Sequence, residues 1–305
     1  MTASHMTTHS AQSTATQDGP VRPAPPTHGA GAPGIVTQAA AKASSARLSS
    51  DAPRRRVKAV VFDIDDTICD STNAFRTGID LVIEHYMPAL DPQQRDEAYR
   101  LWCADPNGHY RSYTRGECSF DEQRMARANE LNRHFGGPVI SKQEYFDTWK
   151  PLFWDTFCAN WRAHDDVRPC LDALHTAGIA LGAISNASSQ LQQRKLKACG
   201  CAGEVPLLVT MDTFGFGKPD RRVFDEAARK LGLETGEVAY VGDEFDIDAQ
   251  AACVAGMRGF WIDRPSRHSE AKSRRLPDTS LAWAADAVTR LESLEQLPDE
   301  ICATR

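Results

Sequence analysis

The sequence has no uninterrupted apolar run of about 18 residues, the length that a membrane-spanning helix requires. It also has no excess of basic residues, because 35 lysines and arginines face 41 aspartates and glutamates and leave a net charge of -6. A nucleic-acid-binding protein would need a basic face. The composition therefore predicts neither a membrane span nor a nucleic-acid partner.

Paired C-x-x-C spacings are also absent, although the chain contains nine cysteines. Their odd number and scattered positions indicate neither a disulfide framework nor a zinc site. We interpret them as reduced thiols, which are typical of a cytoplasmic protein. A secretory leader is not expected, because no apolar core of about 7–15 residues follows a basic start.

Residues 1–53 have few large apolar side chains and are dominated by Ala, Ser, Thr, Pro and Gly. Such a segment buries too little apolar surface to offset the entropy that ordering removes. We therefore expect a disordered N-terminal tail, followed by a folded part that starts near Val57.

From Val57 onward, short apolar runs alternate with amphipathic helical segments. The predicted strands are Val57–Phe62, Ile179–Ile184, Pro206–Thr210, Val238–Val241 and Gly259–Ile262. The predicted helices between them are Arg168–Ala177, Ser189–Cys199, Arg221–Leu231 and Ile247–Ala255. This alternation is typical of a parallel sheet covered by helices on both faces. The predicted fold class is therefore α/β, and residues 287–297 are expected to add a short strand and helix.

The interval 67–166 breaks the alternation. Its roughly 100 residues carry apolar side chains almost entirely at helical spacing, among them Trp102, Trp149, Trp154 and Trp161. A structureless loop of that length is uncommon within a compact domain. We therefore expect an inserted helical domain whose core contains these tryptophans.

The first predicted strand ends in three carboxylates within four residues, those of Asp63, Asp65 and Asp66. Like charges packed so closely repel one another, and burial of each carboxylate is unfavourable. A divalent cation with oxygen ligands, with Mg2+ as the expected ion, would supply the counter-charge. The alternative is an acidic helix N-cap, which needs only one aspartate.

The segment Asp63-Ile64-Asp65-Asp66-Thr67 resembles the first motif, D-x-D-x-T, of the haloacid dehalogenase (HAD) superfamily. Three later segments resemble the other motifs of that superfamily and occur in the same order: Ile184-Ser185-Asn186, Gly217-Lys218-Pro219-Asp220 and Gly242–Asp248. Ligands of open parallel sheets bind at the carboxyl ends of the strands. The four segments are therefore expected to meet in one crevice.

Each motif also has a structural alternative when it is taken alone. Ser185 and Asn186 could cap the helix that starts near Ser189. Lys218 and Asp243 could lie in ordinary turns. The joint occurrence favours the functional interpretation, because four independent structural alternatives would otherwise have to coincide.

The resemblance implies a Rossmann-like core domain formed by residues 54–67 and 167–305. It also implies that residues 68–166 form the helical type I (C1) cap of subfamily I. His109, Arg111 and Arg115 lie in a polar stretch of this expected cap. We interpret them as solvated surface, with contact to a second anion of the substrate as the alternative.

The resemblance further implies catalytic roles. Asp63 would be the nucleophile that forms an aspartyl-phosphate, and Asp65 would be the general acid and then the general base. Lys218 would neutralise Asp63 and the phosphoryl group. Ser185 and the N–H of Asn186 would hold phosphate oxygens.

The metal ligands implied by the resemblance are Asp63, Asp65 and Asp243, with the backbone carbonyl of Asp65 as one contributing group. Asp248 would support Lys218 or the waters of the metal. The implied cofactor is Mg2+.

The expected function is Mg2+-dependent hydrolysis of a small phosphomonoester through an aspartyl-phosphate. A phosphomutase on the same fold is one alternative. A 2-haloacid dehalogenase is another, although dehalogenases of the family lack the second acid and the metal that Asp65 and Asp243 imply. A non-catalytic binding or scaffold protein is a third. The substrate stays open, since nucleotides and sugar phosphates fit equally well.

Overall fold

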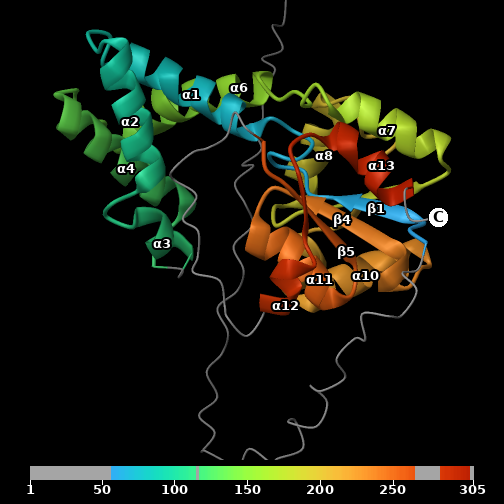
Figure 1. Cartoon of the computed structure of the whole chain (residues 1–305). Helices are drawn as coiled ribbons and strands as arrows, with labels where there is room; N and C mark the ends of the chain where they lie inside the picture. The colour runs from blue at the N-terminus through green and yellow to red at the C-terminus, as the bar shows by residue number, and fades with distance from the viewer. Residues whose placement is uncertain (1–55, 115–116, 265–281, 303–305) are drawn as a thin grey trace, which may run out of the picture.

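The computed structural model describes residues 56–114, 117–264 and 282–302, so the expected tail, residues 1–53, lies outside the described chain. Within those ranges the chain forms a six-stranded parallel sheet of order β3-β2-β1-β4-β5-β6 (Figure 1). The strands are β1 (Ala59–Phe62), β2 (Ala180–Ile184), β3 (Leu207–Val209), β4 (Val238–Gly242), β5 (Arg258–Ile262) and β6 (Thr289–Leu291). The predicted α/β fold with a parallel sheet is confirmed, and β6 lies in the segment expected to add a last strand.

Helices cover both faces of this sheet. They are α7 (Val167–Thr176), α8 (Ser189–Ala198), α9 (Met211–Phe214), α10 (Arg221–Leu231), η3 (Thr235–Glu237), η4 (Phe245–Gln250), α11 (Ala251–Ala255), α12 (Ala282–Asp286), η7 (Leu294–Gln296) and α13 (Leu297–Cys302). Among the described residues, no helix is both long enough and apolar enough to cross a membrane.

The strand β1 shows why the sheet needs helices on both sides. Its alternate residues point to opposite faces. Val60 and Phe62 belong to one apolar core, which they share with residues of α7, α8 and α13. Ala59 and Val61 belong to a second core, formed with α10 and α11. Figure 1 shows the same division, with α7, α8 and α13 on one side of the sheet and α10 and α11 on the other.

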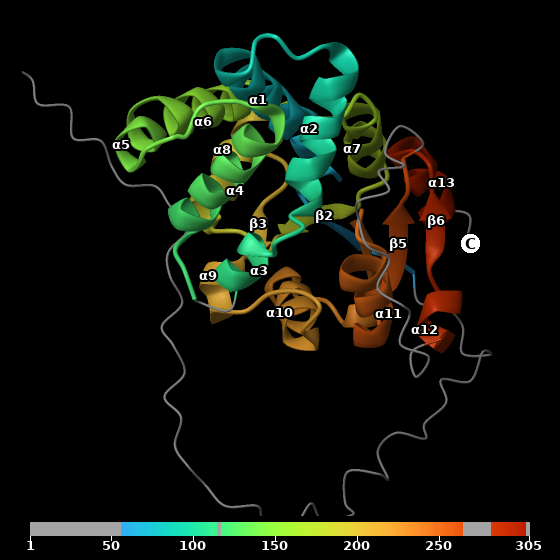
Figure 2. The ribbon, with the colours of Figure 1, turned by 90° about the vertical axis from the view of Figure 1, so that its left-hand side faces the viewer.

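A separate set of helices lies between β1 and β2 in the sequence. We call it the helical insertion; it comprises α1 (Ser71–Tyr86), α2 (Pro92–Ala104), α3 (His109–Thr114), α4 (Phe120–Phe135), α5 (Lys142–Glu144), η2 (Tyr145–Trp149) and α6 (Lys150–Ala159). In Figures 1 and 2 it projects from the end of the sheet at which β1 leads into α1.

The helical insertion has an aromatic core. Trp102 and Trp149 stack with their ring centroids 5.5 Å apart, and Trp149 stacks on Phe153 at 5.5 Å. Trp102, Trp149 and Trp161 are buried, and Trp154 packs partly buried against the same apolar cluster. The expectation that these tryptophans form core is confirmed.

Two connecting segments, 64–70 and 160–166, join the insertion to the sheet. The N–H of Asp70 donates to the carbonyl of Arg162 at 2.9 Å, and the N–H of His164 donates to the carbonyl of Ile68 at 3.0 Å. The chain therefore leaves the sheet and returns to it through two segments that lie side by side.

The predicted helix Ile247–Ala255 differs from the observed structure. A π-helical turn, η4, spans Phe245–Gln250, and the regular helix α11 follows it. The wide turn brings Asp248 against Gly242, where an added Cβ would lie 2.3 Å from the Asp248 carboxyl carbon. Helical periodicity does not reveal such a turn, which is frequent at functional sites.

Candidate active site

The carboxyl ends of three adjacent strands carry predicted site residues. Asp63 directly follows β1, Ser185 follows β2 and Asp243 follows β4. The N–H of Asp63 donates to the carbonyl of Val241 at 2.8 Å and so fixes the end of β1 to β4. Because β1 lies between β2 and β4, the three side chains are at one edge of the sheet.

Lys218 reaches the same edge from the turn that precedes α10. Its Nζ lies 2.6 Å from Asp63 Oδ1 and 2.6 Å from Asp248 Oδ1. It also donates to the Tyr240 hydroxyl at 2.9 Å. All four side chains are buried. The structure therefore brings together Asp63, Lys218 and Asp248, and it adds Tyr240, which the sequence analysis missed.

The charges in this cluster are not balanced. Burial raises the pKa of Asp63 well above its usual value; Lys218 opposes that rise, and the carboxylates of Asp248 and Asp243 add to it. Burial would lower the pKa of Lys218, but Asp248 and Asp63 raise it well above its usual value. Lys218 therefore remains an ammonium group, and its single charge does not offset the carboxylates around it.

Three carboxylates in this cluster could hold a cation. One oxygen each of Asp63, Asp243 and Asp248 lies within 4.8 Å of the others. Oxygen ligands alone, with an uncompensated negative charge, fit a hard divalent ion such as Mg2+. The predicted ligand Asp65 does not contribute its side chain to this group, whereas Asp248, expected only as support, does.

Asn186 positions the turn that carries Lys218. Its Oδ1 accepts a hydrogen bond from the Lys218 N–H at 2.7 Å, and its Nδ2 donates to the Lys218 carbonyl at 2.9 Å. Gly217 permits this close approach, because a Cβ there would lie 2.1 Å from Asn186 Oδ1. The side chain of Asn186 is thus occupied with the backbone, and its predicted phosphate contact through the N–H stays a prediction.

The Asp65 side chain is held by residues of α1 and α8. Ser71 Oγ, Lys195 Nζ and Gln192 Nε2 all donate to its carboxylate, the last at 2.7 Å. Burial favours a higher pKa for Asp65, but the charge and hydrogen bond of Lys195 outweigh it and lower the pKa. In this arrangement the carboxylate of Asp65 is therefore ionised.

Gln192 also connects Asp65 to the second motif. Its Nε2 donates to Ser185 Oγ at 2.9 Å, and Ser185 is buried. The N-cap of α8 is Ser188, whose side chain accepts from the N–H of Leu191 at 3.4 Å. The alternative in which Ser185 only caps this helix is therefore wrong.

Lys195 and Gln192 were not identified from the sequence. Their spacing of three residues on α8 places them on one helical face, but a lysine on a polar helix normally predicts solvated surface. Both are buried here. Of the polar residues considered in the expected cap, His109 lies 3.2 Å from Glu130, Arg111 lines a pocket and Arg115 falls outside the described residues.

The family described as haloacid dehalogenase-like hydrolase matches residues 57–256. The chain belongs to this family, and the predicted HAD-like hydrolase is confirmed. A curated relative is the glyceraldehyde 3-phosphate phosphatase of Methanothermobacter thermautotrophicus. It is 28% identical over 251 residues, which are 80% of this chain and 99% of the relative.

Solved structures with the same fold include two hydrolases of the family. The HAD hydrolase YfnB of Bacillus subtilis, solved bound to magnesium, has a TM-score of 0.60 at 17% identity and covers 81% of this chain and 100% of its own. The L-2-haloacid dehalogenase of Xanthobacter autotrophicus has a TM-score of 0.54 at 17% identity, covering 80% and 98%. At such identities the likeness concerns the fold alone. It does not separate a phosphatase from a dehalogenase.

Proposed function

We propose that this hydrolase is a Mg2+-dependent phosphatase that cleaves a small phosphomonoester through an aspartyl-phosphate on Asp63. The observation that carries the proposal is the buried cluster in which Lys218 contacts both Asp63 and Asp248 and a third carboxylate, that of Asp243, lies close by. The similarity to a curated phosphatase along most of the chain supports the same reaction class.

We further propose that residues 54–67 and 167–305 act as the core domain and residues 68–166 as a cap. The support is that helices α1–α6 all lie between β1 and β2, with the paired connecting segments leading to them. In this arrangement the core handles the phosphoryl group and the cap faces the remainder of the substrate.

In the first step, a carboxylate oxygen of Asp63 bonds to phosphorus while the bond from phosphorus to the leaving oxygen breaks. A proton from Asp65 neutralises that leaving oxygen. Lys218 offsets negative charge beside Asp63, and Ser185 Oγ with the N–H of Asn186 is suited to phosphate oxygens. For this step Asp65 has to exchange its contact with Lys195 for one with the leaving oxygen, since the contact with Lys195 favours the ionised form.

In the second step, the ionised Asp65 takes a proton from water as the water oxygen bonds to phosphorus. The bond between phosphorus and Asp63 breaks, which releases phosphate and restores the carboxylate. The lowered pKa of Asp65, caused by Lys195 against the opposing effect of burial, suits this basic role.

Asp63, Asp243 and Asp248, with the backbone carbonyl of Asp65, are the groups that would hold Mg2+. When bound, the ion supplies positive charge that stabilises the phosphoryl oxygens. It would also relieve the repulsion that contributes to the raised pKa of Asp63 after burial.

Release of phosphate and nitrophenol from p-nitrophenyl phosphate tests the proposal. Turnover should require Mg2+, disappear in excess EDTA and return when Mg2+ is restored. Mg2+ should also raise the melting temperature of the wild type, because a ligand that binds only the folded state stabilises it. Asp243→Asn should weaken that rise, whereas the exposed substitution Asp225→Asn should leave it unchanged.

Three outcomes would contradict the proposal. Full turnover in excess EDTA would exclude the metal requirement. Chloride release from 2-chloropropionate without phosphate release from any ester would identify a dehalogenase. Transfer of the phosphoryl group to a sugar phosphate, with no transfer to water, would identify a mutase.

A further inference from the structure

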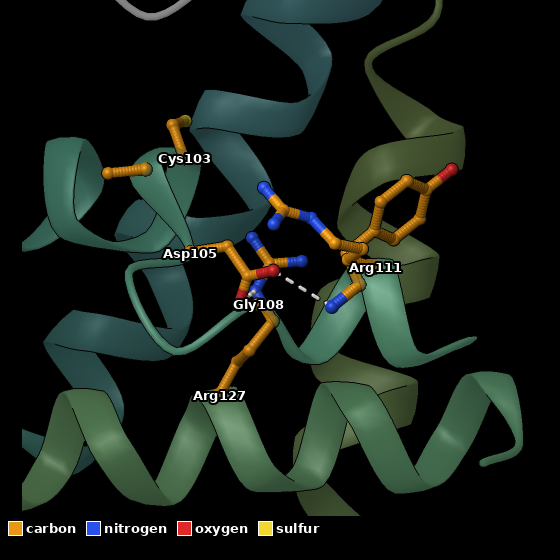
Figure 3. A pocket seen from close by; sticks show the side chains of 7 residues that line it. Cys103, Asp105, Gly108, Arg111 and Arg127 are labelled. Atoms are coloured by element: carbon orange, nitrogen blue, oxygen red, sulfur yellow. Dashed lines mark hydrogen bonds and ion pairs between the residues drawn. The ribbon is translucent and has the colours of Figure 1, made fainter. Parts of the chain in front are cut away.

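The helical insertion contains a pocket of about 450 Å³ beside the loop that connects α2 to α3 (Figure 3). Cys103 and Asp105 come from the end of α2, Arg111 from α3 and Arg127 from α4. Figure 3 shows the guanidinium groups of Arg111 and Arg127 extending from two different helices into the space above Asp105. Two cations therefore converge on one small cavity.

The side chains that line the pocket have a net positive charge, whereas the net charge of the whole chain is negative. The lining has two guanidinium groups and one carboxylate, whereas the protein has a net charge of -6. Asp105 also serves the start of α3, because its carboxylate accepts the N–H of His109 at 3.1 Å and of Tyr110 at 2.8 Å. The Asp105 carboxylate is therefore shared between the backbone of α3 and the pocket, whose lining holds more cationic than anionic groups.

Arg127 is a largely covered cation, and one of its donors lacks a hydrogen bond. Its side chain is only 12% exposed, and its guanidinium lies 4.3 Å from the centroid of the Trp102 ring. Its Nε is 3.6 Å from Asp105 Oδ1, too long for a hydrogen bond, and has no other hydrogen-bond partner among the described residues. The Nη2 atom donates to the Trp102 carbonyl. Burial lowers the pKa of Arg127, and an anion in the pocket would offset that desolvation.

The helix α2 links this pocket to the loop that follows the first strand. Tyr99 on α2 lies one helical turn, or about 6 Å, before Cys103, which lines the pocket. Burial raises the pKa of the Tyr99 phenol, and the Asp66 carboxylate lies close enough to add to that rise. In Figure 1, α3 lies at the end of the helical insertion beside the core domain, on the side where β1 leads into α1. The pocket is thus placed to meet the part of a substrate that extends away from Asp63.

We infer that Arg111 and Arg127 form a subsite for a second anionic group, a carboxylate or a second phosphate, on the phosphomonoester that the enzyme hydrolyses. This inference rests on the proposed phosphatase function and specifies its substrate class. A planar guanidinium binds either anion through two parallel N–H donors. Arg127 is held in place by Trp102 and Asp105, while Arg111 is exposed and can adjust to the ligand.

Matched substrate pairs test the subsite. One pair is 3-phosphoglycerate and glycerol 3-phosphate, which differ in a carboxylate. The other is fructose 1,6-bisphosphate and fructose 6-phosphate, which differ in a second phosphate. The wild type should favour the member that carries the second anionic group in at least one pair, in kcat/KM by about 10- to 100-fold, the range expected for hydrogen bonds to a charged group. The pair that shows the preference identifies the anion.

Arg111→Gln should remove most of this preference, because the exposed residue can be changed without disturbing the core. Arg127→Gln should do the same, and Arg127→Lys should keep part of it, since the charge remains but the planar fork is lost. Arg133→Gln, on the exposed side of α4, is the matched control and should leave the preference unchanged. Equal kcat/KM values within both pairs, or a preference that Arg111→Gln does not alter, would overturn the inference.

Binding measurements separate this inference from the proposed function. In the Asp63→Asn background, calorimetry should show tighter binding of the preferred anionic substrate than of its partner, and Arg111→Gln should abolish the difference. If the wild type hydrolyses no phosphomonoester, the proposed function fails, but this measurement still decides whether the pocket binds the anion. Equal binding of both members of each pair would overturn the subsite.

Discussion

The ammonium group of Lys195 donates a hydrogen bond to the carboxylate of Asp65 from a position 130 residues further along the chain. Lys195 is buried, and its Nζ lies 5.4 Å from the centroid of the Phe157 ring in α6 and 5.7 Å from that of Trp161. Asp65 raises the pKa of Lys195 despite the opposing effect of burial, and Lys195 lowers the pKa of Asp65. The pair therefore favours the charged form of both groups at the point where the helical insertion joins the sheet.

Replacement of Lys195 should shift the pH dependence of turnover. In Lys195→Met the carboxylate of Asp65 loses its counter-charge, so its pKa should rise. If ionised Asp65 is the base for the second step, the acid limb of the kcat profile should move to higher pH.

The pH profile of kcat with p-nitrophenyl phosphate checks this prediction. Lys197→Met, on the exposed side of the same helix, is the matched control and should keep the acid limb of the wild type. A folded Lys195→Met variant with an unchanged acid limb would show that Lys195 does not tune Asp65.

Asp65→Asn should separate the two steps of the reaction. The amide can occupy the place of the carboxylate but can neither donate the proton nor accept one from water. General acid–base catalysis contributes about 100- to 10,000-fold, so steady-state turnover should fall by that order. Because nitrophenol leaves readily without protonation, a burst of nitrophenol should precede slow turnover.

Rapid-mixing measurement of nitrophenol release checks the burst, and an alkyl phosphate provides the comparison with a poor leaving group. The alkyl substrate should be slowed already in the first step. Little change for either substrate in a folded Asp65→Asn variant would assign Asp65 a structural role only.

Asp63→Asn should abolish turnover and leave the fold intact. The substitution removes the nucleophile and keeps nearly the same shape. Burial and the neighbouring carboxylates raise the pKa of Asp63, so the ionised carboxylate is less favourable in this cluster than in water. In metal-free buffer at pH 7, the melting temperature of Asp63→Asn should therefore be equal to or higher than that of the wild type. Hydrolysis at the wild-type rate by a variant that mass spectrometry shows not to be deamidated would remove Asp63 from its role.

Asp166 should control stability in acid. Its Oδ2 accepts hydrogen bonds from Arg264, from the Leu294 N–H at 2.8 Å and from Ser293 Oγ at 3.1 Å. Burial by itself would raise the pKa of Asp166. The hydrogen-bond donors and the charge of Arg264 outweigh burial, so the pKa of Asp166 is lowered. Since only 10% of either side chain in the Asp166–Arg264 pair is exposed, Asp166→Asn should reduce the free energy of unfolding at pH 7 by about 3 kcal/mol.

The pH dependence of that loss follows from the lowered pKa. A carboxyl whose pKa is lower in the folded state stabilises the fold above its unfolded pKa, near 4, and this contribution disappears as the pH falls through the folded value. Urea unfolding at several pH values should show the difference between wild type and Asp166→Asn narrowing below about pH 4. Asp225→Asn, which breaks an exposed ion pair, should change stability by less than about 1 kcal/mol. A difference that stays constant down to pH 2 would contradict this account.

The local pattern of apolar and polar residues predicts the order of the strands and the edge of the sheet where the site lies. Val238–Val241 is a continuous apolar run, and all of its residues are buried. A strand of a parallel sheet is covered on both faces, so such a run predicts it directly. Asp63, Ser185 and Asp243 each follow such a run, so a parallel sheet places them at one edge whatever the details of packing. The strands and the site residues that follow them are predictable because both depend on residues that are neighbours in the chain.

Contacts between distant segments, in contrast, fix which polar groups meet in the site. By residue type alone, Lys195 and Gln192 would be expected on a solvated face of α8. Both are instead buried and hydrogen-bonded to Asp65, because α6 and the connecting segments cover that side of α8. The side chain of Asp248 joins Asp63 and Asp243 because η4 is a π-helical turn and Gly242 leaves room beneath it. Arg111 and Arg127 converge because α3 and α4 pack side by side. Each of these contacts forms only where packing removes a polar side chain from water. Which side chains are covered depends on segments that are distant in the sequence, so neighbouring residues do not predict it.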